Sequence, residues 1–168
     1  MACYTCGFEG KFKKTKIESY RYTECGLDNV FLRHIPGLQC PECKIVSADI
    51  PHPLQLHELL AQMIVTKPFL LTAGEIRFIR TQLGYSQADF AGRLQRNPSV
   101  LNRVERKKEK VSADLDRLVR MVYLKEKTSP KRLYEEVENL IGEKREGQRP
   151  YRFHTVKNDW KYEARAAA

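Results

Sequence analysis

Two Cys-x-x-Cys motifs, Cys3/Cys6 and Cys40/Cys43, limit most strongly what this chain can fold into. Each motif lets two thiolates hold one ion from a tight turn, and two such turns complete a tetrahedral site. Because four thiolates leave no open coordination position, the pattern predicts one structural zinc ion and no catalytic one. The alternative is a redox-active cysteine pair, but the surrounding sequence lacks a thioredoxin-like strand–helix pattern.

The cysteine count is odd, so four ligands and one spare residue, Cys25, fit better than a disulfide framework. We expect Cys25 to lie in a strand, and His34, His52 and His57 to be surface or packing residues. No apolar run approaches the roughly 20 residues that span a bilayer, and the N-terminus does not resemble a signal peptide. The predicted location is therefore the cytoplasm, where thiols stay reduced.

The segment between the cysteine pairs predicts a β-hairpin. Residues 20–25 and 30–35 read as strands, and Gly26-Leu27-Asp28-Asn29 supplies turn residues between them. Few aliphatic residues are available for a core, so metal binding would supply much of the folding free energy.

The net charge of +9 is unevenly distributed along the chain. Residues 1–65 carry seven basic and seven acidic residues. Residues 66–126 carry thirteen basic and seven acidic residues, a net charge of +6. Residues 127–168 carry ten basic and seven acidic residues, a net charge of +3. A basic middle segment is the footprint expected of a surface that faces phosphates, although a merely solvated surface is the alternative.

Helix boundaries are clearest in the middle of the chain. Apolar residues at near-helical spacing predict a linker helix ending at Pro68. Thr72 and Glu75 form a capping box, Ser86 and Asn97 can cap two further helices, and Pro98 fits a first helical position. Ser112 begins a fourth helix of this domain. Short helices with a tight turn between the second and third are typical of a helix-turn-helix.

This region resembles the Xre/Cro-type helix-turn-helix family. The residues in register with that family are Ser86-Gln87, Phe90-Ala91, Leu94, Leu101 and Glu105. The sequence departs from the family at Gln95, where glycine is usual because the turn needs positive φ, and at Arg96, where an apolar residue is usual.

The resemblance implies that the third helix of this domain reads the major groove. Arg103 suits guanine, Asn102 adenine and Val100 a thymine methyl group, with Ser99 beside them. Gln87 would hold a phosphate at the start of the second helix. Non-specific phosphate contacts would come from Arg106, Lys107, Lys108 and Lys110. Ordinary helix solvation is the alternative for Asn102 and Arg103.

The order of motifs along residues 1–125 is similar to that of MqsA-type antitoxins with a YgiT-type zinc finger. The residues that carry this resemblance are Cys3-x-x-Cys6, Cys25 to Leu32, Pro36-Gly37-Leu38-x-Cys40-Pro41-x-Cys43 and Glu75 to Arg80. The resemblance implies an antitoxin that binds a protein toxin, commonly an mRNA-cleaving enzyme. It also implies a homodimer that represses its own operon by binding operator DNA, associated with the nucleoid when bound.

Residues 127–168 lie outside that resemblance. Ser129-Pro130 predicts a helix with Leu133, Val137, Leu140 and Ile141 on one side. The aromatic residues that follow are Tyr151, Phe153, Trp160 and Tyr162, which we interpret as a partner-binding segment. This tail is similar in kind to the extensions of antitoxins that a SecB-like chaperone recognises. The alternative is that the aromatics pack on this chain or its dimer mate.

The sequence thus predicts an α+β protein with four segments. These are a zinc-bound hairpin domain (1–50), a linker helix (51–68), an all-α helix-turn-helix domain (69–126) and a C-terminal helix with an aromatic tail (127–168). The alternatives to an antitoxin are a zinc-containing regulator without a toxin, and a scaffold whose helix-turn-helix no longer binds DNA. An enzyme is not expected, because no catalytic set of carboxylates, nucleophile and base, or phosphate loop appears.

Overall fold

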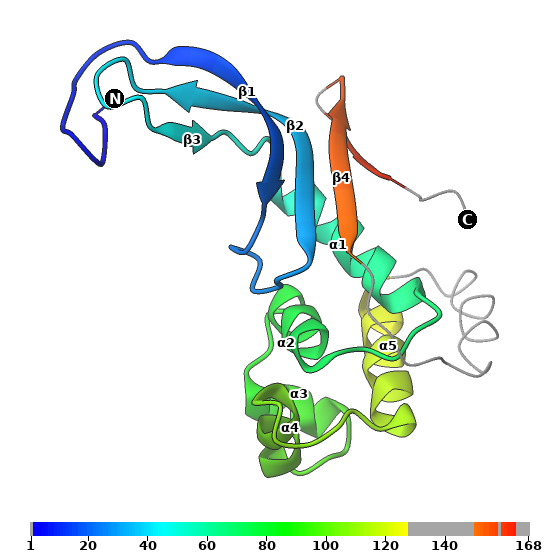
Figure 1. The fold of residues 1–168 in the computed structure, drawn as a ribbon. Helices are drawn as coiled ribbons and strands as arrows, with labels where there is room; N and C mark the ends of the chain where they lie inside the picture. The colour runs from blue at the N-terminus through cyan, green and yellow to red at the C-terminus, as the bar shows by residue number, and fades with distance from the viewer. Residues whose placement is uncertain (1, 128–149, 158, 164–168) are drawn as a thin grey trace. The chain divides into compact units, whose positions relative to one another are not determined.

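A computed structural model describes residues 2–127, 150–157 and 159–163, and its chain divides into two compact units (Figure 1). The first, which we call the sheet unit, comprises Met1–Glu24, Asp28–Leu56 and Pro150–Ala168. The second, the helical unit, comprises Cys25–Leu27 and His57–Arg149. Helix α1 (Pro53–Thr66) runs across this division. The combination of a sheet with helices confirms the predicted α+β class.

The sheet unit is built on one mixed sheet with strand order β1-β2-β4-β5, in which β3 also pairs with β2. The strands are β1 (Lys13–Arg21), β2 (Val30–Gln39), β3 (Val46–Ala48), β4 (Tyr151–Val156) and β5 (Asp159–Tyr162). The pairs β1–β2, β2–β3 and β4–β5 are antiparallel, whereas β4 runs parallel to β2. A strand from the end of the sequence therefore lies beside one from its beginning.

The predicted hairpin exists, but its first strand lies earlier than expected. Strand β1 ends at Arg21, and Cys25 lies in the turn, so its assignment to a strand was wrong. The turn residues themselves are confirmed, since Gly26 has a φ of 81° that favours glycine. The sequence pattern does not predict most of β1, because its lysines interrupt the alternation of apolar and polar residues. Such charges also protect an exposed sheet edge from pairing with other chains.

The aromatic tail forms part of the sheet core. Tyr151, Phe153 and Trp160 are buried, and the Trp160 indole Nε1 donates to the Pro51 carbonyl oxygen at 2.7 Å. Tyr162 is half-buried, with its ring centroid 5.7 Å from that of Phe153. The alternative in which these aromatics pack on the chain itself therefore describes them better than an exposed partner-binding segment. The predicted helix around Leu133 lies outside the described residues.

The described part of the helical unit contains four further helices, whose starting residues agree with the sequence prediction. They are α2 (Ala73–Gln82), α3 (Gln87–Arg93), α4 (Pro98–Glu105) and α5 (Ala113–Lys127). Both halves of the Thr72–Glu75 capping box are present. Ser86 and Asn97 accept amide hydrogen bonds as N-caps of α3 and α4, and the Ser112 hydroxyl accepts the Leu115 amide at 3.2 Å.

The core of the helical unit also encloses an ion pair. Arg120 and Asp116 on α5 have fully buried side chains, and Arg120 Nε lies 2.9 Å from Asp116 Oδ2. The guanidinium also donates to the carbonyl oxygens of Val65, Lys67 and Phe69 at 2.5, 2.9 and 2.7 Å. Arg120 thereby satisfies one backbone acceptor in the last turn of α1 and two in the segment between α1 and α2, which fixes that segment on α5.

Among the described residues, the structure contains no helix long and apolar enough to cross a membrane.

Candidate functional site

Four cysteine side chains in the sheet unit converge on one point. The Sγ atoms of Cys3, Cys6, Cys40 and Cys43 all lie within 4.8 Å of one another. The distances Cys3–Cys43 and Cys6–Cys40 are both 3.7 Å, far longer than a disulfide bond. Metal–sulfur bonds of about 2.3 Å in a tetrahedron place the sulfurs about 3.8 Å apart. The cluster therefore has the dimensions to hold one metal ion, as the sequence predicts.

The two cysteine turns share the same backbone geometry. The Cys3 amide donates to the Phe8 carbonyl, and the Cys40 amide to the Ile45 carbonyl, both at 2.9 Å. The first cysteine of each pair also accepts a hydrogen bond from the residue four positions later, Gly7 at 2.9 Å and Lys44 at 3.1 Å. Gly7 and Lys44 each have positive φ. This repeated geometry directs the four thiols toward one another. In the sequence, the matching Cys-x-x-Cys spacing is the sign of it.

The thiols interact strongly with one another. Amide hydrogen bonds from Cys6 and then Thr5 are the main reasons that the pKa of Cys3 falls to about 6. The Ile45 amide acts to lower the pKa of Cys43, but desolvation and the three neighbouring cysteines outweigh it and raise that pKa to about 12. Cys3 therefore loses its proton more readily than Cys43. A bound cation favours the thiolate forms of its ligands, because it neutralises their charge.

In the helical unit, a polar network joins α2, α3 and α4. The Arg80 side chain donates to both Glu105 carboxylate oxygens, at 2.7 and 3.1 Å, and both side chains are nearly buried. Gln87 Nε2 donates to Glu105 Oε2 at 2.7 Å, and its Oε1 accepts from Asn102 Nδ2 at 3.0 Å. The network fixes the mutual arrangement of the three helices and presents Asn102 in a defined orientation.

The sequence-predicted DNA-binding residues surround this network. Ser99 and Arg103 on α4 are exposed, whereas Val100 and Asn102 are half-buried. Gln87 lies at the start of α3, where its side chain is already hydrogen-bonded within the network. Arg103 Nε donates to the exposed Glu109 carboxylate at 2.9 Å. An exposed pair of this kind contributes little and exchanges readily for a phosphate or base contact.

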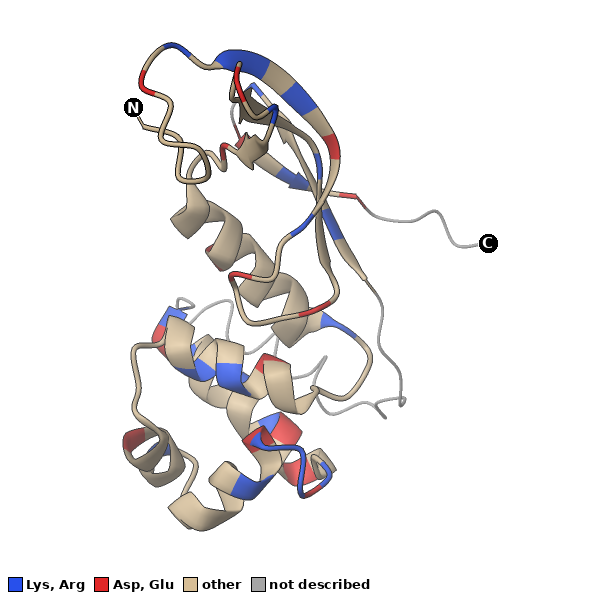
Figure 2. Ribbon diagram, turned by 60° about the vertical axis from the view of Figure 1, so that its left-hand side comes forward, with Lys and Arg blue, Asp and Glu red and all other residues tan. Residues whose placement is uncertain are grey.

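The basic residues that follow α4 lie on an exposed loop of the helical unit. Arg106, Lys107, Lys108 and Lys110 are all exposed, and in Figure 2 the ribbon is coloured blue at lysines and arginines. Lys107 has a φ of 58°, so the chain turns sharply there and presents successive cations around one end of α4.

The backbone of the turn between α3 and α4 shows how Gln95 is accommodated where glycine is usual. Gln95 has a φ of 52°, the left-handed conformation that glycine usually supplies at this position. Its amide donates to the Gly92 carbonyl oxygen at 3.1 Å, and the Arg96 amide donates to the Ala91 carbonyl oxygen at 2.9 Å. The backbone adopts the conformation that the turn requires although the residue does not favour it.

Replacing Gln95 with glycine should therefore stabilise the helical unit by about 0.5–1 kcal/mol. Glycine removes the left-handed penalty, while its larger unfolded-state entropy offsets part of the gain. Urea unfolding followed by far-ultraviolet circular dichroism measures this change. Arg96→Gly is the matched control and should destabilise, because Arg96 does not have positive φ. Equal destabilisation by both variants would contradict the assignment of strain to Gln95.

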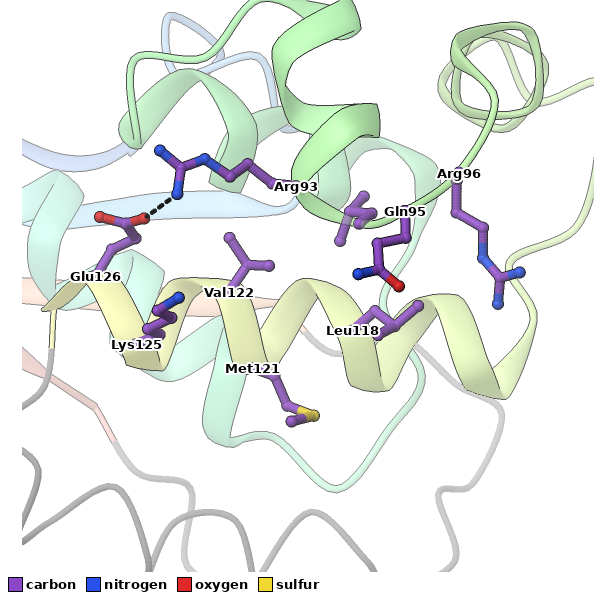
Figure 3. A pocket seen from close by; sticks show the side chains of 9 residues that line it. Arg93, Gln95, Arg96, Leu118, Met121, Val122, Lys125 and Glu126 are labelled. Atoms are coloured by element: carbon purple, nitrogen blue, oxygen red, sulfur yellow. Dashed lines mark ion pairs between the residues drawn. The ribbon is translucent and has the colours of Figure 1, made fainter.

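A pocket of about 590 Å³ lies behind this turn, against α5 (Figure 3). Its apolar wall comes from Leu94, Leu118, Met121 and Val122, and Met121 is 47% exposed. Charged side chains stand at its edge, where Arg93 lies 3.7 Å from Glu126. This face of α5 is apolar and accessible within the described part of the chain.

Comparison of the chain with protein-family models, characterised proteins and solved structures gives no match.

Proposed function

We propose that this protein is a DNA-binding repressor that acts as an antitoxin, with zinc stabilising its sheet unit. The observation that carries the DNA-binding part is the helix pair α3–α4. Its turn adopts positive φ at Gln95, a nearly buried Arg80–Glu105 pair joins α4 to α2, and α4 exposes Ser99 and Arg103. Each of these features supports a helix-turn-helix arrangement in which α4 enters the major groove.

The polar network supports a specific manner of base readout. Both Glu105 carboxylate oxygens accept from Arg80, and Gln87 turns its amide nitrogen toward the same carboxylate. Gln87 Oε1 then faces Asn102 Nδ2, which leaves Asn102 Oδ1 and its second N–H for a partner. An amide with one free donor and one free acceptor suits an adenine edge, and Arg103 suits guanine.

Zinc is the metal that the cysteine cluster suits best. Four sulfur ligands with near-tetrahedral separations favour zinc or iron over hard cations, which prefer oxygen. Zinc needs no redox partner and commonly stabilises small domains by holding two Cys-x-x-Cys turns. Cys3, Cys6, Cys40 and Cys43 would hold the ion, whose role is structural.

The apolar face of α5 supports a homodimer. Leu118, Met121 and Val122 form an accessible apolar surface in the helical unit. A dimer that joins two such units would present two copies of α4 to half-sites about one helical turn of DNA apart. We propose this face as the dimer contact.

Replacing Arg103 with alanine should weaken binding to the DNA upstream of the protein's own coding region by about 5- to 150-fold. The variant removes a side chain suited to bidentate contact with guanine, worth about 1–3 kcal/mol. A gel-shift titration at fixed salt measures the effect. Arg117→Ala on α5 is the control, since Arg117 is about as exposed as Arg103. Unchanged sequence-specific binding by Arg103→Ala would contradict the proposed readout.

The antitoxin role rests on the resemblance of the motif order, and co-purification tests it. The full chain expressed with its neighbouring genes should retain a small protein that arrests growth when expressed alone. A chain that binds its DNA but retains no such protein would instead be a regulator without a toxin.

A further inference from the structure

The face of the sheet opposite its aromatic core carries an array of cations. Directly paired residues of neighbouring strands project to the same side of a sheet. One row across β2, β4 and β5 pairs Arg33 with His154, and His154 with Lys161. The adjacent row across β1, β2 and β4 pairs Arg21 with Phe31, and Phe31 with Arg152. We call these two rows the outer face.

The strand alternation supports this assignment. Val30, Leu32, Tyr151, Phe153 and Trp160 alternate with the outer-face residues and are all buried. By contrast, Arg21 and Lys161 are exposed, and Phe31, Arg33, Arg152 and His154 are half-buried. The outer face is therefore solvent-accessible in the described part of the chain.

Little on the described chain neutralises these charges. Arg33, Arg152 and Lys161 form no ion pair with any described residue, and Arg33 Nε is buried without a hydrogen-bond acceptor. Arg21 Nε donates to the Asp28 carbonyl oxygen at 2.9 Å, which leaves its charge unpaired. Two acidic residues adjoin this face: Asp159, which shares it with Lys161 by strand alternation, and Glu163, whose carboxylate lies 3.6 Å from His154 Nδ1. A buried guanidinium nitrogen without an acceptor is costly, so a bound anion would relieve it.

We propose that the outer face binds single-stranded nucleic acid. Neighbouring strands lie about 4.8 Å apart, so each row presents its side chains at that spacing along an extended path. Arginine and lysine would contact phosphates, and Phe31, at the centre of its row, would stack on a base. Open sheet faces that combine cations with a central aromatic are a common way of binding unpaired nucleotides.

The composition of this face favours nucleic acid over an acidic protein. The centre of a protein interface is usually apolar and depleted in charged residues. Here four of the six outer-face side chains are arginine or lysine, and arginines flank the single aromatic on either side. The outer face would therefore bind single strands separately from α4, whose proposed contacts recognise a DNA duplex.

A binding titration on the full chain tests the proposal. The probes are fluorescent 12-nucleotide oligouridine RNA and oligothymidine DNA, measured by anisotropy over a range of salt concentrations. The triple variant Arg33→Ala, Arg152→Ala, Lys161→Ala should bind at least tenfold more weakly. Its salt slope should fall by about 2, since each lost phosphate contact removes about 0.7 for a single strand. Comparing the affinities for the two probes shows whether RNA or DNA is preferred.

Matched variants separate the outer face from net charge. Lys13→Ala, Lys14→Ala, Lys16→Ala removes the same charge from exposed positions of β1 and should change affinity less than about threefold. Phe31→Leu keeps an apolar side chain but removes the stacking surface, and should weaken binding about tenfold.

Three results would overturn the proposal: equal losses in the two triple variants, no binding of either oligonucleotide by the natural chain, or tighter binding of a polyglutamate peptide of the same length. The last result would assign the face to an acidic protein. Binding of duplex DNA should stay unchanged in the outer-face variant, so failure here is distinguishable from failure of the proposed repressor function.

Discussion

Replacing Cys40 with serine should abolish metal binding and unfold the cysteine-bearing part of the sheet unit. The cluster then keeps three thiols, and the apparent binding free energy of a structural zinc, about 10–16 kcal/mol, is coupled to folding. We expect the metal content to fall from about one ion per chain to nearly none. We expect the free energy of unfolding of the sheet unit to fall by more than about 4 kcal/mol.

Cys25 provides a matched control for this experiment. It is a cysteine in the turn after β1 and does not belong to the four-sulfur cluster. Cys25→Ser should keep one ion per chain, as measured by elemental analysis. Trp160, the single tryptophan, is buried in the sheet unit, so its fluorescence reports unfolding there. Equal metal content in the two variants would contradict the four-cysteine site.

Replacing Arg120 with methionine should destabilise the helical unit by about 3–5 kcal/mol. Methionine retains much of the side-chain volume but leaves the Asp116 carboxylate buried without its partner. The carbonyl oxygens of Val65, Lys67 and Phe69 also lose their donor. Urea unfolding followed by far-ultraviolet circular dichroism measures the loss, because the helices dominate that signal.

Arg117 lies on the same helix and provides the control. Its guanidinium is 3.7 Å from Asp114, and both side chains are substantially exposed. Arg117→Met should therefore cost less than about 1 kcal/mol. Adding Asp116→Leu to Arg120→Met should recover part of the loss, because it removes the unpaired buried charge. Indistinguishable losses for Arg117→Met and Arg120→Met would contradict the role assigned to the buried pair.

The features that the sequence predicts well are local ones. Each cap acts within one helical turn, so Thr72, Ser86, Asn97 and Ser112 mark their helices without knowledge of the fold. The cysteine cluster is likewise evident because Cys-x-x-Cys spacing fixes two ligands at once. At residue 95 the sequence was misleading, because glutamine there adopts a positive φ that its side chain does not favour.

The features that the sequence predicts poorly depend on distant parts of the chain. Tyr151 and Phe153 alternate with polar residues, as do Trp160 and Tyr162, and that period of two was the available indication of strands. Nothing local indicates that β4 pairs in parallel with β2, more than one hundred residues earlier. The burial of Arg120 is equally non-local, since an arginine enters a core only where several acceptors converge.

We propose above all that the helical unit recognises a specific DNA sequence. The most direct test is the anisotropy of the full chain with two labelled duplexes, one from upstream of its coding region and one with the same bases shuffled, at a fixed salt concentration. We expect at least about 100-fold tighter binding to the upstream duplex. Removal of the metal by a chelator should leave a preference for that duplex. Equal affinity for the two duplexes would contradict the proposed function.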